Sequence, residues 1–153
     1  MTPGPADLAG VVSRGVAFAV DAVVALVVAT LGYQVALAVL GVVGLASTSG
    51  TSAATALGYL LSLPVVFAVY CAGFWALLGR TPGMMVLGLR VVAGDGGPPG
   101  AGRSAVRALG YWVSAIGLVG FLWVAVDRQR QGFHDKLAGT YVVYDRAGDD
   151  GLA

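Results

Sequence analysis

The sequence has few of the residues from which catalytic and metal sites are built. Among its 153 residues there is no glutamate, one histidine (His134) and one cysteine (Cys71). A single cysteine excludes an intramolecular disulfide, and so few ligands argue against a metal site. We find no nucleophile accompanied by a general base. The sequence therefore predicts a protein that is not an enzyme and that uses neither a metal nor another cofactor.

Charge of either sign is also scarce. Charged residues make up 11% of the chain, hydrophobic residues 58%, and the mean hydropathy is +0.83. Soluble domains are about 45–50% apolar and about 25% charged. The net charge of +1 gives no electrostatic argument for binding nucleic acid. These values predict an integral membrane protein whose principal partner is the lipid bilayer.

Two long apolar runs predict membrane helices over residues of about 11–45 and about 56–78. Each is long enough to cross a hydrocarbon core of about 30 Å. The first run is about twice as long as the apolar part of a signal peptide, so we expect it to remain in the protein. The loop Ser47–Thr55 is polar and uncharged, and residues 1–10 and 145–153 are expected to form flexible tails.

The character of the chain changes after the second run. Thr81 followed by Pro82 is typical of a helix start, and residues 82–90 suit a short helix lying in the membrane interface. Two β-like runs, Arg90–Val92 and Thr140–Tyr144, are predicted to pair as a small ribbon.

A third apolar run covers residues of about 105–126 and is long enough for one more span. The loop Ser47–Thr55 lacks Lys and Arg and should face outward, which places the N-terminus in the cytoplasm. A complete third span would then put the basic residues after it outside, against the positive-inside rule. A re-entrant hairpin avoids this conflict, and both alternatives stay open. The predicted fold is an all-α polytopic membrane protein with about three apolar helical segments, an interfacial helix and a minor β-like ribbon.

An aspartate, Asp21, interrupts the first apolar run, which has no other charge from Gly15 to Ala46. A carboxylate at such a depth costs about 2.5–3.5 kcal/mol on insertion scales, so it marks a functional-site hypothesis. Arg14 precedes it by seven residues and falls on the same helical face. We expect Asp21 to need a cationic partner, for which Arg14, Arg107 and Arg90 are the candidates.

Two interpretations of Asp21 follow from its position. In the first it handles a proton or a cation, being neutral in one state and ionised in another. In the second it is a structural pin that fixes helix packing. The pair His134 and Asp135 has no accompanying nucleophile or second histidine, so it predicts a surface turn and a short helix with the aspartate as cap or ion-pair partner.

Three motifs in order resemble the RDD family, a membrane domain named for one arginine and two aspartates. Arg14, Ala17 and Asp21 match its opening Arg-x-x-Ala-x-x-x-Asp pattern. The middle and closing motifs are similar to the segments Gly79–Gly83 with Leu87–Val92, and Gly132–Val143. The resemblance makes Asp135 the second named aspartate and places Arg107 where the family often has an arginine. Met84 and Met85 depart from it, since basic residues are common there.

The resemblance covers nearly the whole chain and predicts an RDD-like membrane domain over residues 11–144. It implies a multi-pass protein of a bacterial or archaeal cell membrane. Transport has been suggested for the family, including sodium/proton exchange for some members, and this implies binding or movement of a small solute or cation. The alternative is a non-catalytic accessory or scaffold subunit of a larger membrane complex. In either case we expect a homo-oligomer or a subunit of a complex.

Overall fold

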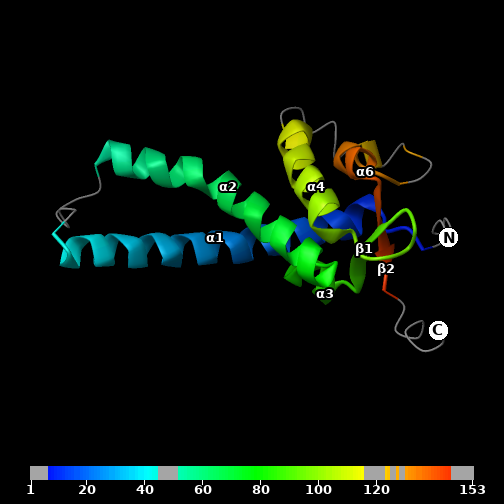
Figure 1. The fold of residues 1–153 in the computed structure, drawn as a ribbon, viewed down its shortest axis with the longest axis horizontal. Helices are drawn as coiled ribbons and strands as arrows, with labels where there is room; N and C mark the ends of the chain where they lie inside the picture. The colour runs from blue at the N-terminus through cyan, green and yellow to red at the C-terminus, as the bar shows by residue number, and fades with distance from the viewer. Residues whose placement is uncertain (1–6, 45–51, 116–122, 125–126, 128–129, 146–153) are drawn as a thin grey trace. The chain divides into compact units, whose positions relative to one another are not determined.

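The structure is a computed structural model that describes residues 7–44, 52–115, 123–124, 127 and 130–145 (Figure 1). The chain divides into two compact units. We call Met1–Asp21 with Ala68–Ala153 the head unit, and Ala22–Phe67 the hairpin unit. The elements, in chain order, are α1 (Val11–Val42), α2 (Ala53–Leu78), α3 (Pro82–Val86), β1 (Leu89–Ala93), α4 (Gly100–Ala115), α6 (Phe133–Ala138) and β2 (Thr140–Tyr144).

Helices α1 and α2 are long and apolar enough to cross a membrane, with mean hydropathies of 2.3 and 2.0 in their most apolar stretches. At 1.5 Å per residue, the 32 residues of α1 extend about 48 Å. Large apolar side chains lie exposed along both helices, as at Val39 (56%) and Val69 (67%). Such surfaces are unfavourable in water and suit a lipid environment. The first two predicted apolar helices are therefore confirmed, with bounds shifted by a few residues.

Hydroxyl groups link the two helices within the hairpin unit. Thr30 and Tyr59 share a hydrogen bond of 2.7 Å between their hydroxyl groups, and the Tyr33 hydroxyl donates to the Thr55 carbonyl at 3.0 Å. The rings of Tyr33 and Tyr59 lie 4.9 Å apart. In apolar surroundings, hydrogen bonds between helices fix their register, so these contacts align α1 with α2 inside this unit.

The predicted ribbon is confirmed in the head unit, where β1 and β2 pair antiparallel from Leu89 opposite Tyr144 to Ala93 opposite Thr140. Leu8 adds a single bridge to Val143, and the Ala9 N–H donates to the Val142 carbonyl at 2.9 Å. Leu8 and Ala9 are buried, whereas we expected residues 1–10 to form a flexible tail. The residues just before α1 therefore belong to the core of the head unit.

The short helix predicted over residues 82–90 is present but shorter than predicted, and its place in the membrane interface stays a prediction. Thr81 caps α3 by accepting the Met84 N–H at 3.4 Å, and Pro82 begins the helix as expected. The helix ends at Val86 because Gly88 takes a left-handed conformation, with φ +60°, that turns the chain into β1. The last two residues of the expected 82–90 segment thus belong to the strand.

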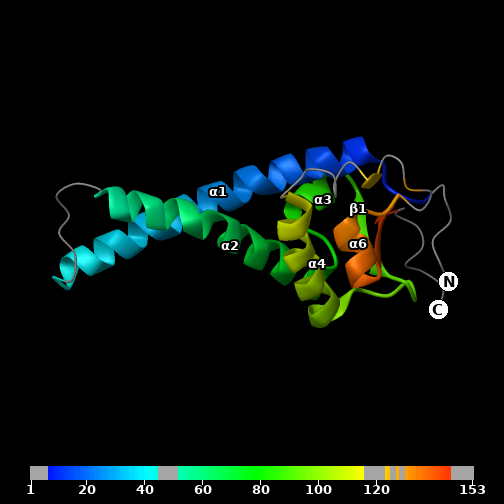
Figure 2. The ribbon, with the colours of Figure 1, turned by 90° about the horizontal axis from the view of Figure 1, so that it is seen from above.

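Helix α4 begins at Gly100, five residues before the predicted third apolar segment. Its 16 residues are fewer than the roughly 20 that a span requires. Most of residues 116–126 fall outside the described residues, so the choice between a span and a re-entrant hairpin stays a prediction. Both views show α4 and α6 side by side in the head unit (Figures 1 and 2). Gly110 permits this packing, because a Cβ there would lie 2.9 Å from the His134 Cα.

Candidate functional site

Two aspartates are buried in the head unit, and each collects polar partners from segments far apart in the sequence. Asp21 on α1 is 3% exposed, and Asp135 on α6 is fully buried. A buried carboxylate requires hydrogen bonds or opposite charge to offset the loss of hydration. The partners of the two aspartates differ in kind, and this difference defines the site.

Asp21 accepts hydrogen bonds from three donors, all of them uncharged. The Gly83 N–H and the Tyr70 hydroxyl donate to its Oδ1 at 2.8 and 3.0 Å. The Thr81 hydroxyl donates to its Oδ2. The carboxyl group therefore joins α1 to α2 and to the start of α3. We call Asp21, Tyr70, Thr81 and Gly83 the Asp21 site.

A glycine is required where α3 meets α1. A Cβ at Gly83 would lie 2.9 Å from the Asp21 Cγ and would also clash with the Ala17 carbonyl oxygen. Real Cβ atoms do not approach so closely, so a larger residue would push α3 away from α1. The absence of a side chain at Gly83 lets its backbone N–H reach the carboxylate.

The structure corrects the expectation that Asp21 pairs with a cation. Among the described residues, no arginine lies within ion-pair distance of Asp21. Arg14 and Arg107 instead bind Asp135, and the Arg90 Nε lies 3.6 Å from a carboxylate oxygen of Asp145. Arg14 and Asp21 share a helical face, but seven residues separate their Cα atoms by about 10 Å along the axis, too far for a direct pair.

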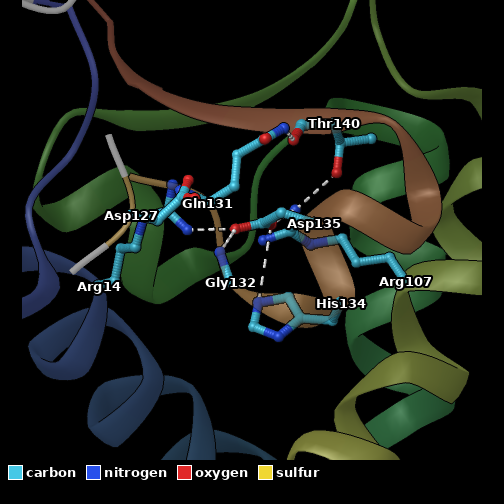
Figure 3. A network of polar contacts seen from close by, with 8 residues as sticks. All are labelled: Arg14, Arg107, Asp127, Gln131, Gly132, His134, Asp135 and Thr140. Carbon is cyan, nitrogen blue, oxygen red and sulfur yellow. Dashed lines mark hydrogen bonds and ion pairs between the residues drawn. The ribbon is translucent and has the colours of Figure 1, made fainter. Parts of the chain in front are cut away.

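Asp135 lies between two arginines at the centre of a polar network (Figure 3). Arg14 binds its Oδ2 and Arg107 binds its Oδ1, each through Nη1. The Gly132 N–H also donates to Oδ2 at 2.8 Å, which caps the start of α6 as predicted for this aspartate. The Arg107 Nη1 donates as well to the Thr140 hydroxyl at 2.9 Å. We call Arg14, Arg107 and Asp135 the ion cluster.

The two arginines determine the charge of Asp135. Burial alone would raise the pKa of this carboxyl group, but Arg107 and Arg14 outweigh burial and hold the pKa well below its usual range. His134 is also buried, not on the surface as we expected. Burial lowers the pKa of His134 to about 3, although Asp135 partly opposes this shift. At neutral pH the ion cluster therefore holds an ionised aspartate beside a neutral histidine.

Aromatic rings pack against the ion cluster. The Arg107 guanidinium lies 4.6 Å from the centre of the Trp75 ring, an arrangement that favours a cation over an aromatic face. Tyr111 contacts Trp75 and His134, with ring centres 5.3 and 4.4 Å away. These rings exclude water, which strengthens the charge interactions beside them.

Sequence reasoning singled out Arg14, Arg107, Asp21 and Asp135 but not the groups around them. Tyr70, Thr81 and Gly83 were missed as partners of Asp21, and Trp75 was missed as the ring beneath Arg107. The three donors to Asp21 lie on α2 and at the start of α3, so the residues one helix turn away from Asp21 on α1 give no sign of them. Among the described residues, no three His, Cys, Asp or Glu side chains gather as metal ligands would.

Two apolar helices, together with a buried arginine–aspartate–arginine cluster in the head unit, define a small membrane-type domain. The model of the RDD family matches residues 8–139, which is most of the chain. The chain therefore belongs to the RDD family, as its three motifs indicated. No curated protein and no solved structure matches the chain.

Proposed function

We propose that the chain is a multi-pass protein of the cell membrane, with a cytoplasmic N-terminus, that binds or moves a small cation or solute. In this proposal Asp21 is the carboxyl group that gains and loses a proton during the cycle. The supporting observation is that Asp21 is buried on a helix long and apolar enough to span the membrane, and that its hydrogen-bond partners among the described residues are uncharged.

The hydrogen bonds of Asp21 suit both protonation states. The Gly83 N–H can only donate, so Oδ1 must remain an acceptor. The Thr81 hydroxyl at Oδ2 can donate or accept, since a hydroxyl group carries one hydrogen and two lone pairs. When a proton is added to Oδ2, the hydroxyl can rotate and accept it. Asp21 can thus change charge without displacement of any heavy atom.

The ion cluster has a different role in this proposal. Asp135 is held ionised by two arginines, so a proton cannot be added to it near neutral pH. It therefore serves as a fixed anchor for α1, α4 and α6, while the proposed proton exchange is assigned to Asp21. We also propose that the chain is not an enzyme and needs no cofactor.

The direct test is proton flux in proteoliposomes. A trapped pH-sensitive dye would report the response to pulses of Na⁺, K⁺ or Li⁺, with Asp21→Asn run beside the wild type. We expect flux in the wild type and its loss in Asp21→Asn. Asp145→Asn is the matched control, because this aspartate is 23% exposed and pairs with Arg80. Folded wild-type protein that gives no flux for any ion would contradict the proposal.

A second candidate is a non-catalytic accessory or scaffold subunit of a larger membrane complex. The observation that favours it is that Asp21 is 3% exposed and has both oxygens occupied, as a purely structural residue would. The mass of the detergent-solubilised protein separates the two candidates. A homo-oligomer favours transport, whereas a partner that co-purifies in fixed ratio favours the accessory role.

A further inference from the structure

One edge of the Arg14 guanidinium is buried and unused. Its Nη1 binds Asp135, but its Nε and Nη2 have no hydrogen-bond partner among the described residues and almost no contact with solvent. The N–H groups on Nε and Nη2 lie side by side and form the fork that grips two oxygens of a carboxylate or a phosphate. An unpaired buried donor is unfavourable, and here two adjacent donors lack an acceptor.

The charge of the ion cluster is also out of balance. Arg14 and Arg107 carry two positive charges, and Asp135 supplies one negative charge. His134 does not add to either sign at neutral pH, because burial lowers its pKa to about 3. The neighbouring Asp127 lies in Figure 3 near Arg14, but its carboxylate pairs with Lys136. Counting Arg14, Arg107 and Asp135 alone, the ion cluster carries one surplus positive charge.

Arg14 is the better placed of the two arginines to receive a ligand. Its side chain is 11% exposed, whereas that of Arg107 is 1% exposed and stacked on Trp75. Arg14 is the fourth residue of α1, a helix long and apolar enough to span the membrane. A cationic residue in the first turn of such a helix lies at the depth of the lipid headgroups.

We propose that the Nε–Nη2 edge of Arg14 binds a phosphate oxyanion, supplied at this depth by a phospholipid headgroup. The phosphate would complete the hydrogen bonds of the fork and neutralise the surplus positive charge of the ion cluster. This site differs from the Asp21 site, and it does not depend on transport. Its role would be to set the depth and tilt of α1 at the membrane surface.

The first experiment needs no variant. Native mass spectrometry of the wild-type protein in detergent would compare phosphatidic acid with diacylglycerol of the same acyl chains. We expect a retained phosphatidic acid adduct and little diacylglycerol, since the two lipids differ only in the phosphate. Equal retention of both would overturn the proposal. If inorganic phosphate displaces the phosphatidic acid adduct, the site takes a free oxyanion and the assignment to a lipid is overturned.

The second experiment uses Arg14→Lys, which keeps a positive charge to pair with Asp135 but removes the fork. Losing one of two charge-assisted hydrogen bonds should weaken phosphatidic acid binding about tenfold. Arg80→Lys is the matched control, because Arg80 is 42% exposed and already pairs with Asp145 at 2.6 Å. Equal losses in both variants, or no loss in Arg14→Lys, would overturn the proposal. If Arg14→Lys does not fold, the lipid comparison on the wild type decides.

Discussion

The two buried aspartates of the head unit are held in opposite ways. Asp21 has three uncharged donors, and Asp135 has two arginines and a backbone N–H. Both carboxyl groups are almost completely removed from solvent. Burial is nearly the same for the two aspartates, so the difference between them comes from the charge of their partners.

The comparison separates a group that can change its charge from one that cannot. A hydroxyl partner can turn from donor to acceptor, so the Asp21 site tolerates a proton. A guanidinium cannot turn in this way and is always charged, so the ion cluster requires an anion at Asp135. Four changes test this contrast, and they follow in order of expected effect.

Asp135→Asn should produce the largest loss of stability. The substitution leaves Arg14 and Arg107 buried without a counter-charge, and loss of one partner from a buried ion pair costs about 3–5 kcal/mol. Unfolding in detergent, followed by circular dichroism, would measure it. Asp145→Asn, at a more exposed ion pair, is the control and should cost below about 1 kcal/mol. Similar losses in the two variants would show that the cluster is not the anchor.

Acidification should also destabilise the head unit. The pKa of His134 is about 3 in the folded protein and about 6.5 when unfolded, so the unfolded chain binds this proton first. The stabilisation is complete above pH of about 6.5 and is lost as the pH falls toward 3. Asp135, whose pKa is lowered, adds a loss that begins below pH of about 4. The chain has one histidine, so His134→Gln should make the unfolding midpoint less dependent on pH between about 6.5 and 4.5. An unchanged pH profile would rule out His134 as the cause.

Gly83→Ala should have an intermediate effect and act mainly on the Asp21 site. The new methyl group would force α3 away from Ala17 and Asp21, and overpacking of this kind costs about 1–3 kcal/mol. The Gly83 N–H would then lose the carboxylate, so proton flux should fall as well. Gly73→Ala on α2 is the control, because a Cβ there meets nothing within 4 Å. Equal behaviour of the two variants would mean that α3 is free to shift.

Asp21→Asn should have the smallest effect on stability. The amide oxygen can still accept from Gly83 and Tyr70, and its NH₂ group can donate to the Thr81 hydroxyl. The expected loss is about 1 kcal/mol, in contrast with the larger loss for Asp135→Asn. Thermal unfolding of both variants under the same conditions measures the two losses of stability. A loss as large as that of Asp135→Asn would identify Asp21 as a structural pin.

Much of the fold could be predicted because its signals are local. The apolar runs of α1 and α2 are long, Thr81 with Pro82 marks a helix start, and short runs rich in valine mark the ribbon. The end of α3 was missed because it depends on the left-handed turn at Gly88. The burial of Leu8 was missed because it depends on a bridge to Val143, which local pattern does not reveal.

The site was harder to predict than the fold. Charged residues make up 11% of this apolar chain, so the sequence singles out Arg14, Asp21, Arg107 and Asp135. Pairing them was not possible from spacing, since the Arg14–Asp135 contact joins residues 121 positions apart. The neutral donors to Asp21 carry no charge signal, and Thr81 had a sufficient explanation as a helix cap. The packing of α3 against α1 shows that the Thr81 hydroxyl group both caps α3 and donates to Asp21.

The 121-residue separation between Arg14 and Asp135 has a consequence for the order in which the ion cluster is made. A ribosome adds Arg14 first, then Arg107, and reaches Asp135 121 residues after Arg14. Both arginines therefore enter the forming protein before the carboxylate that neutralises them exists. We expect the ion cluster of the head unit to close only after α6 has been synthesised. Until then neither guanidinium has the carboxylate that neutralises it in the folded head unit.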